Sequence, residues 1–208
     1  MASMKVGIVN FGMGNLASIS NALNRLEVNH IFLEDAGHFN KVGKLILPGV
    51  GAFGSAMEAL RERGMVDALL RYVEDLDRHV LGICLGMQLL LSESCEHGDF
   101  HGLNLLPGRV KFLKDVMGDL LIPNIGWCNV KARGGSVLLS NLSKEQLCFY
   151  FVHSYYCVVD DRKAVSGLLD YGDEIDVVVE HENIFGCQFH PEKSQRSGLQ
   201  VLENFIRL

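Results

Sequence analysis

A cysteine between two glycines is the residue of this chain best suited to act as a nucleophile. Gly82-Ile83-Cys84-Leu85-Gly86 has the form G-x-C-x-G and separates an apolar stretch, typical of a strand, from a run of good helix formers. A strand that turns abruptly into a helix strains the residue at the turn, and side chains two positions before and after it would collide. The turn also places Cys84 at a helix start, where unpaired N–H groups favour a thiolate.

Gln88 lies one helical turn after Cys84 and on the same face, so it could hold a substrate beside the thiol. The pentapeptide alone also fits another interpretation. Free cysteines are common in protein cores, and Cys84 could be a small buried apolar residue beside two packing glycines.

A histidine and a carboxylate that could assist Cys84 occur together in Phe189-His190-Pro191-Glu192. His190 could accept the thiol proton, and Glu192, two residues on and on the same side of an extended chain, could orient the imidazole. The segment alone could equally be an ordinary turn with a solvated carboxylate. Together with the Cys84 turn, it favours nucleophilic catalysis.

Pro48-Gly49-Val50-Gly51 follows a short apolar stretch, at the end of a predicted parallel strand where ligands gather in open sheets. Its N–H groups, with that of Leu85, could form an oxyanion hole. A plain strand-to-helix turn is the alternative.

These residues need an alternation of strands and helices to position them. Apolar stretches predict strands at 5–10, 30–33, 44–47 and 80–83, and helical spacing predicts helices at 16–26, at 55–75 with an interruption near Gly64, and at 85–91. This order predicts an α/β fold with a parallel sheet and helices on its faces. Further strands are expected at 109–113, 128–131, 148–152, 155–159, 177–181 and 184–189, the last two joined by a turn at Glu182-Asn183, before a closing helix.

The composition excludes several function classes. The 208 residues fit a single domain, 1–208, and the net charge of −6, with no basic run, argues against nucleic acid as a partner. The longest apolar stretch, 80–91, is too short to span a membrane, and no secretory segment is recognisable, so we expect a soluble, cytoplasmic protein. The six cysteines include no C-x-x-C pair, which favours reduced thiols over disulfides or zinc.

The motifs resemble those of the class I (triad-type) glutamine amidotransferases, and among these most closely the glutaminase subunits of imidazole glycerol phosphate synthase. The most specific matches are Pro48-Gly49-Val50-Gly51-Ala52-Phe53, the segment from Gly82 to Leu90, Tyr150-Phe151-Val152-His153-Ser154-Tyr155-Tyr156, and His190-Pro191-Glu192-Lys193-Ser194. The resemblance implies a flavodoxin-like α/β fold with a mostly parallel central sheet flanked by helices, and neither cofactor nor metal.

The resemblance also implies roles for individual residues. Cys84 would attack the side-chain amide of glutamine, His190 would protonate the departing ammonia, Glu192 would hold His190, and water would hydrolyse the thioester. The implied glutamine-binding and oxyanion positions are Gly49, Val50, Gly51, Leu85, Gln88, His153, Ser154 and Tyr155. For His153 we expect the backbone, rather than the imidazole, to serve function.

The implied partner is a cyclase subunit with a (β/α)8 barrel. It would form a heterodimer with this chain and use the ammonia in histidine biosynthesis. Three positions depart from the family pattern: Phe11 stands where Tyr is usual, and Asn124 and Cys128 stand where His and Asn are usual. Because the loop with Asn124 and Cys128 lies near the partner interface in the family, a subunit that supplies ammonia to a surface-sugar amidation enzyme is an alternative.

Three other interpretations come from different chemistry. Gly12-x-Gly14-x-x-Ala17, with Glu34 and Asp35 following Gly12 by 22 and 23 residues, is close to a dinucleotide-binding fingerprint. It leaves Cys84 and His190 unexplained and leaves little room for a substrate domain. A metal site from Cys95, His97 and His101 would have no standard ligand spacing. A non-catalytic binding protein would retain the triad only as a relic.

Overall fold

The computed structural model describes residues 5–115 and 120–208, and one half of its sheet is parallel. The strands follow the order β2-β1-β3-β4-β13, and each is parallel to its neighbours. Their bounds are β1 Val6–Val9, β2 His30–Leu33, β3 Lys44–Leu47, β4 His79–Ile83 and β13 Ile184–Cys187. In such a sheet the carboxyl ends of the strands meet at one edge, where Cys84 and Pro48 follow β4 and β3.

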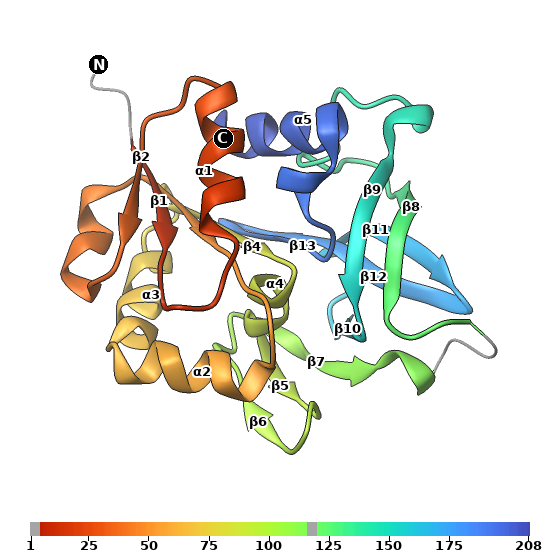
Figure 1. Cartoon of the computed structure of the whole chain (residues 1–208), viewed down its shortest axis with the longest axis horizontal. Helices are drawn as coiled ribbons and strands as arrows, with labels where there is room; N and C mark the ends of the chain where they lie inside the picture. Colours follow the sequence, from red (N-terminus) through yellow and green to blue (C-terminus); the bar gives the residue numbers. More distant parts are fainter. Residues whose placement is uncertain (1–4, 116–119) are drawn as a thin grey trace.

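Helices cover both faces of this parallel part (Figure 1). On one face lie α1 (Leu16–Arg25) and α5 (Gln195–Ile206), and on the other α2 (Phe53–Glu62) and α3 (Met65–Val73). Strand β3 shows why both faces are needed, since successive side chains point to opposite sides. Leu45 and Leu47 pack in the core that contains α2 and α3, and Ile46 packs with α1 and α5.

The second half of the sheet is mainly antiparallel. It continues from β13 through β12, β10, β7, β5 and β6, while β11 joins β12 to β8, and β8 pairs with β9. The bounds are β5 Leu91–Ser94, β6 Phe100–His101, β7 Leu106–Phe112, β8 Asn124–Ala132, β9 Cys148–His153, β10 Tyr155–Val159, β11 Val165–Tyr171 and β12 Asp173–His181. Short helical turns complete the chain: α4 Leu85–Leu89, η1 Ala36–Lys41, η2 Leu113–Asp115, η3 Lys144–Gln146 and η4 Pro191–Lys193.

The expected α/β fold with a mostly parallel central sheet between helices is confirmed, and several elements differ from the sequence prediction. The helix after Cys84 ends at Leu89 rather than near Leu91, because Leu91 starts β5 and pairs with Leu106 of β7. Strands β5, β6 and β11 are absent from the sequence prediction. Strand β11 contains Gly167 and a register irregularity, so it lacks a regular alternation.

Other local predictions are confirmed. Gly64 has a φ of +63° and separates α2 from α3. The turn at Glu182-Asn183 joins β12 to β13 as a hairpin in which His181 pairs with Ile184. Within residues 5–115 and 120–208, no helix has the length and apolar character needed to cross a bilayer.

Candidate active site

The turn from β4 to α4 holds Cys84 in a strained backbone conformation. Its φ is +54° and its ψ is −110°, a region that residues with side chains rarely occupy. A Cβ on Gly82 would lie 2.6 Å from the Gly86 carbonyl oxygen, and one on Gly86 would lie 1.8 Å from the Leu47 carbonyl oxygen. The two glycines therefore leave room for the sharp turn, as the spacing predicts.

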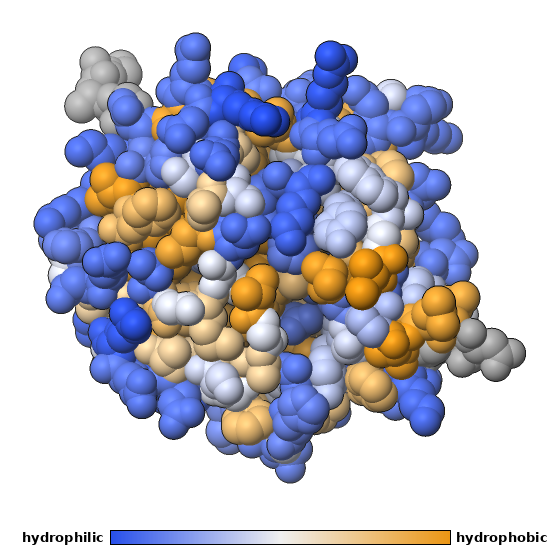
Figure 2. All heavy atoms as spheres, viewed as in Figure 1, coloured by the Kyte–Doolittle hydropathy of each residue, from blue (hydrophilic) through white to orange (hydrophobic). Residues whose placement is uncertain are grey.

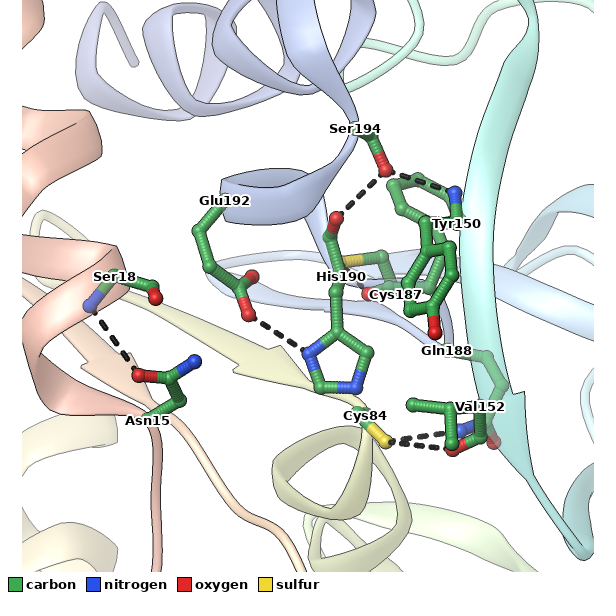
Figure 3. Close-up of polar contacts among 11 residues, drawn as sticks. Asn15, Ser18, Cys84, Tyr150, Val152, Cys187, Gln188, His190, Glu192 and Ser194 are labelled. Carbon is green, nitrogen blue, oxygen red and sulfur yellow. Dashed lines mark hydrogen bonds and ion pairs between the residues drawn. The ribbon is translucent and has the colours of Figure 1, made fainter. Parts of the chain in front are cut away.

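The Cys84 side chain is buried, and polar groups from two other segments surround its sulfur (Figure 3). The Cys84 amide donates to the Cys187 carbonyl at 2.8 Å, which ties the turn to β13. Gln188 Nε2 donates to Cys84 Sγ at 3.7 Å, and the thiol faces the Val152 carbonyl oxygen at 3.9 Å. The sulfur thus lies where β4, β9 and the end of β13 meet.

His190 and Glu192 form a buried pair beside Cys84 (Figure 3). His190 Nδ1 lies 2.8 Å from Glu192 Oε1. The expectation of an extended chain between them is wrong, because Pro191–Lys193 forms a 3₁₀ turn, η4, which still directs the carboxylate at the ring. The main chain of His190 is braced as well: Ser194 Oγ donates to its carbonyl at 2.6 Å and accepts from the Tyr150 amide at 2.9 Å.

The imidazole of His190 favours a proton. Burial alone would lower its pKa, but interactions with the neighbouring Cys84 thiol and with the Glu192 carboxylate outweigh burial and raise the pKa to about 9. Because Nδ1 faces Glu192, Nε2 is the nitrogen turned toward Cys84, and no group in the described chain hydrogen-bonds to it. Nε2 is therefore free to exchange a proton with the sulfur or with a bound molecule.

A pocket of about 560 Å³ opens over the sulfur. Most of the residues singled out from the sequence line it: Val50, Gly51, Cys84, Leu85, Gln88, His153, Ser154, Tyr155 and His190. Gly49 and Glu192 do not. Gly49 packs against Leu85, since a Cβ on it would lie 2.9 Å from the Leu85 Cβ, and Glu192 contacts the pocket only through His190.

Two polar residues of the site were missed by the sequence analysis. Glu96 lines the pocket with its carboxylate buried, and Oε2 accepts from the Phe53 amide at 2.7 Å. Gln188 is fully buried and bonds to Cys84. Neither residue belongs to a local sequence pattern that indicates a functional site. Cys95, His97 and His101 form no metal-ligating group with each other or with other described residues.

The imidazole of His153 makes two hydrogen bonds inside the pocket wall. Nδ1 lies 2.8 Å from the Tyr155 carbonyl oxygen, and Nε2 lies 3.1 Å from Asn124 Nδ2. Burial lowers the pKa of His153 to about 4; the bond to Tyr155 opposes this and the nearby His190 adds to it. His153 is therefore neutral at physiological pH, and its ring holds the wall together.

Comparison with known proteins agrees with this geometry. Residues 8–208 match the family described as glutamine amidotransferase class-I. The chain belongs to this family. Imidazole glycerol phosphate synthase subunit HisH of Chlorobium chlorochromatii is 47% identical over 204 residues, which cover 98% of this chain and 100% of the relative. The subunit HisH of Chlorobaculum tepidum is 44% identical over 201 residues, which cover 96% of this chain and 98% of the relative.

Solved structures support the same fold. PurLQS from Thermotoga maritima matches with a TM-score of 0.77 at 18% identity, covering 99% of this chain and 98% of the other. A structure described as a glutamine amidotransferase matches with a TM-score of 0.73 at 20% identity, covering 97% of each chain. The predicted class I glutamine amidotransferase is thus confirmed as the family, and the dinucleotide-binding interpretation of Gly12 and Gly14 is superseded.

Proposed function

We propose that this amidotransferase hydrolyses glutamine through a cysteinyl thioester on Cys84. The observation that carries the proposal is the strained Cys84 facing the free nitrogen of a His190 that Glu192 orients. Cys84 Sγ attacks the side-chain carboxamide carbon after its proton passes to His190 Nε2. His190 then gives this proton to the leaving nitrogen, and ammonia departs as the C–N bond breaks.

The second half of the reaction releases glutamate. With ammonia gone, His190 Nε2 is neutral and can take a proton from water as the water oxygen attacks the thioester carbon. The C–S bond breaks, and the proton returns to the Cys84 sulfur. Glu192 keeps the His190 ring in one tautomer throughout, because its carboxylate accepts the hydrogen bond from Nδ1–H in every step.

The pocket offers complementary groups for each part of glutamine. Gln88 uses its NH₂ on Tyr155 and Gln188, which leaves its carboxamide oxygen for the substrate, and Glu96 supplies a carboxylate for the α-ammonium. The main chain of Gly51 and of His153, Ser154 and Tyr155 completes the substrate contacts. The Leu85 amide opens α4 and has no carbonyl of that helix to bond, so it can donate to the oxyanion together with the backbone of Gly49 and Val50.

The chain acts, in this proposal, as the single glutaminase domain, residues 1–208, of imidazole glycerol phosphate synthase in the cytoplasm. The names of its relatives support this assignment, and the six free thiols fit a reducing compartment. The partner is a cyclase subunit with a (β/α)8 barrel. It forms a heterodimer with this chain and receives the ammonia through its core for histidine biosynthesis.

Exposed apolar side chains near the pocket support a protein partner there. Val50, at the rim, is 42% exposed, and Leu121, Ile125 and Trp127 are 82%, 60% and 48% exposed. The last three flank Pro123, which also lines the pocket. Figure 2 shows apolar side chains gathered across the middle and lower right of this face. Such a patch is typical of an interaction surface.

The departures at Asn124 and Cys128 favoured a second candidate, a subunit that serves a surface-sugar amidation enzyme. Along β8 the side chains alternate, so that Ile125 and Trp127 are exposed while Asn124 is buried and Cys128 half-buried. The two departures therefore alter the inner face of β8 more than its outer one. This supports the cyclase as the partner.

The test compares two nitrogen sources in the assembled synthase. Cys84→Ala, combined with the histidine-pathway cyclase subunit, should abolish glutamine-dependent product formation and leave synthesis from added ammonium salts intact. Cys95→Ala, at an exposed cysteine, is the matched control and should retain both. Loss of both activities in Cys84→Ala, or of neither, would overturn the proposal. Turnover with a sugar-pathway partner but not with the cyclase would favour the second candidate.

A further inference from the structure

The main-chain carbonyl of Tyr155 fixes the direction of a hydrogen-bond network in the pocket wall. A carbonyl oxygen can only accept, so each side-chain nitrogen that faces it must donate. Gln88 Nε2 lies 3.1 Å and His153 Nδ1 2.8 Å from this oxygen. Two chains of hydrogen bonds start at this oxygen. In each of them, the donor of one hydrogen bond determines which group donates in the next.

One chain leads to the nucleophile. Because Gln88 presents its NH₂ to Tyr155, the contact of 3.0 Å between Gln88 Nε2 and Gln188 must use the Gln188 carbonyl oxygen. The NH₂ of Gln188 is then turned to Cys84 Sγ, 3.7 Å away. Both N–H groups of Gln88 are used by the protein, so only its carbonyl oxygen is left for a ligand in the pocket.

The other chain leads away from the sulfur, to β8. His153 donates from Nδ1, so its neutral Nε2 accepts from Asn124 Nδ2. The Asn124 oxygen in turn accepts from the Cys128 thiol, 3.6 Å away. This chain meets the first at the Tyr155 carbonyl and makes no contact with Cys84, which makes it a useful comparison.

Gln188 is held too firmly to be an incidental neighbour. Its side chain is fully buried, and its amide donates to the Val177 carbonyl of β12 at 2.9 Å. The preceding residue, Cys187, accepts the bond from the Cys84 amide. The same short segment thus positions both the backbone and the sulfur of the nucleophile.

From this arrangement we infer that Gln188 is a positioning residue that does two things at once. Its carbonyl, together with that of Tyr155, holds Gln88 with the acceptor oxygen toward the substrate, and its NH₂ stabilises the anionic form of the Cys84 sulfur. In the part of the chain that the structure describes, Gln188 is the one side chain that donates a hydrogen bond to this sulfur. The inference rests on the proposed glutaminase reaction for its consequence, but its effect on the thiol exists without substrate.

The experiment measures alkylation of Cys84 by iodoacetamide as a function of pH, resolved by peptide mass spectrometry because the chain has six cysteines. Gln188→Met, similar in length but without polar atoms, should move the midpoint of this profile to higher pH. It should also slow alkylation at pH 7 about three- to ten-fold, the effect of one lost hydrogen bond. The KM for glutamine should rise by a smaller factor, because Gln88 loses one of the two bonds that fix its carboxamide and keeps the other, to the Tyr155 carbonyl.

Gln200→Met is the matched control, since the side chain of Gln200, among the described residues, bonds only within α5, to Glu203 and Asn204. It should alter neither the alkylation profile nor KM. Asn124→Leu, which breaks the other chain, should leave the alkylation profile unchanged. An alkylation profile of folded Gln188→Met that superimposes on the wild-type profile would overturn the inference, and so would a shift of equal size in Asn124→Leu.

Gln188→Glu keeps the size of the residue and provides a test if the methionine variant does not fold. At a pH where the introduced carboxyl is ionised, it still accepts from Gln88 but no longer donates to the sulfur. Alkylation should slow at least as much as in Gln188→Met, while KM stays within about two-fold of wild type. Unchanged alkylation would contradict the inference. Because alkylation needs no glutamine, the alkylation results hold whether or not the chain proves to be a glutaminase.

Discussion

The two sides of the pocket are held in different ways. The side that carries Cys84 and His190 is buried, and main-chain bonds to Cys187 and Tyr150 and the Ser194 hydroxyl brace it. The opposite rim is open: Val50 and Pro123 are exposed and Ser154 is half-buried. The reacting groups are therefore ordered by the fold itself, as are Gln88 and His153, whereas the rim residues that face the proposed partner lie at the surface.

This difference indicates that the buried side and the rim serve different functions. A pair such as His190 and Glu192 keeps its geometry without help, because the fold excludes water from it. A rim without such support can change shape when another molecule covers it. Substitutions on the buried side should affect chemistry and stability strongly, and substitutions at the rim should affect association.

The largest effect is expected at Glu192. Its Oε1 accepts from His190, and its Oε2 is buried with no partner among the described residues. Glu192→Gln must either bury its NH₂ unsatisfied or turn it against His190 Nδ1, which selects the wrong tautomer. We expect kcat for glutamine to fall by about 10²- to 10⁴-fold. Steady-state kinetics with the exposed Glu145→Gln as control would check this, and a loss of less than ten-fold would contradict the role of Glu192.

A large effect on stability is expected at the turn beside Cys84. A Cβ on Gly86 would lie 1.8 Å from the Leu47 carbonyl oxygen, so backbone would have to move. Gly86→Ala should lower the free energy of unfolding by about 3 kcal/mol or more. The matched control is Gly134→Ala, whose added Cβ would meet no atom within 4 Å. Urea denaturation of both variants compares the two sites, and equal midpoints would show that the turn is not rigid.

The Gly86 site also shows what sequence can reveal. The turn is encoded locally: a strand, a cysteine between two spaced glycines and a helix follow one another within a few residues, so its geometry could be predicted. The pairing of His190 with Glu192 was also expected, although from the wrong backbone, since η4 is a 3₁₀ turn rather than extended chain. A short spacing can bring two side chains together in more than one conformation.

Glu96 and Gln188 show which site residues the sequence alone could not predict. Glu96 acquires its place from the Phe53 amide, 43 residues away in sequence, and Gln188 from Gln88, 100 residues away. No local sequence pattern around a single glutamate or glutamine indicates a contact with a residue so distant in sequence. The long helices and the parallel strands β1, β2, β3, β4 and β13, whose apolar character is local, were predicted well, but the short β5 and β6 and the irregular β11 were not.

At the rim, Ile125→Glu should weaken binding of the cyclase subunit. Ile125 is 60% exposed on the outer face of β8. Association with the partner would bury the introduced carboxylate, and burying an unpaired charge costs free energy. We expect a 10- to 100-fold increase in Kd, roughly the effect of a central interface residue. Leu76→Glu, equally exposed but in the loop between α3 and β4, is the control. Titration calorimetry would measure both, and similar Kd values would place the interface elsewhere.

The smallest effect should appear in the protonation of the two buried histidines, whose pKa values are displaced in opposite directions. His190, with a pKa of about 9, stabilises the fold fully below its ordinary pKa near 6.5, and this contribution is lost as pH rises through about 9. His153, with a pKa of about 4, resists protonation, so stability is lost as pH falls from about 6.5 toward 4. Both contributions are therefore present together only near pH 6.5.

Removing the thiol separates these two contributions. Cys84→Ala takes away a group that raises the pKa of His190, so the His190 ring should lose its proton at lower pH than in the wild type. Cys95→Ala, at an exposed cysteine, should leave that titration unchanged. NMR of the imidazole nitrogens, with His190 assigned by its loss in His190→Ala, would follow each ring separately. If the titration of His190 is the same with and without the Cys84 sulfur, the thiol and the imidazole do not interact. The protonation of His190 would then depend on Glu192 and burial alone, in contrast to what the geometry of the buried side indicates.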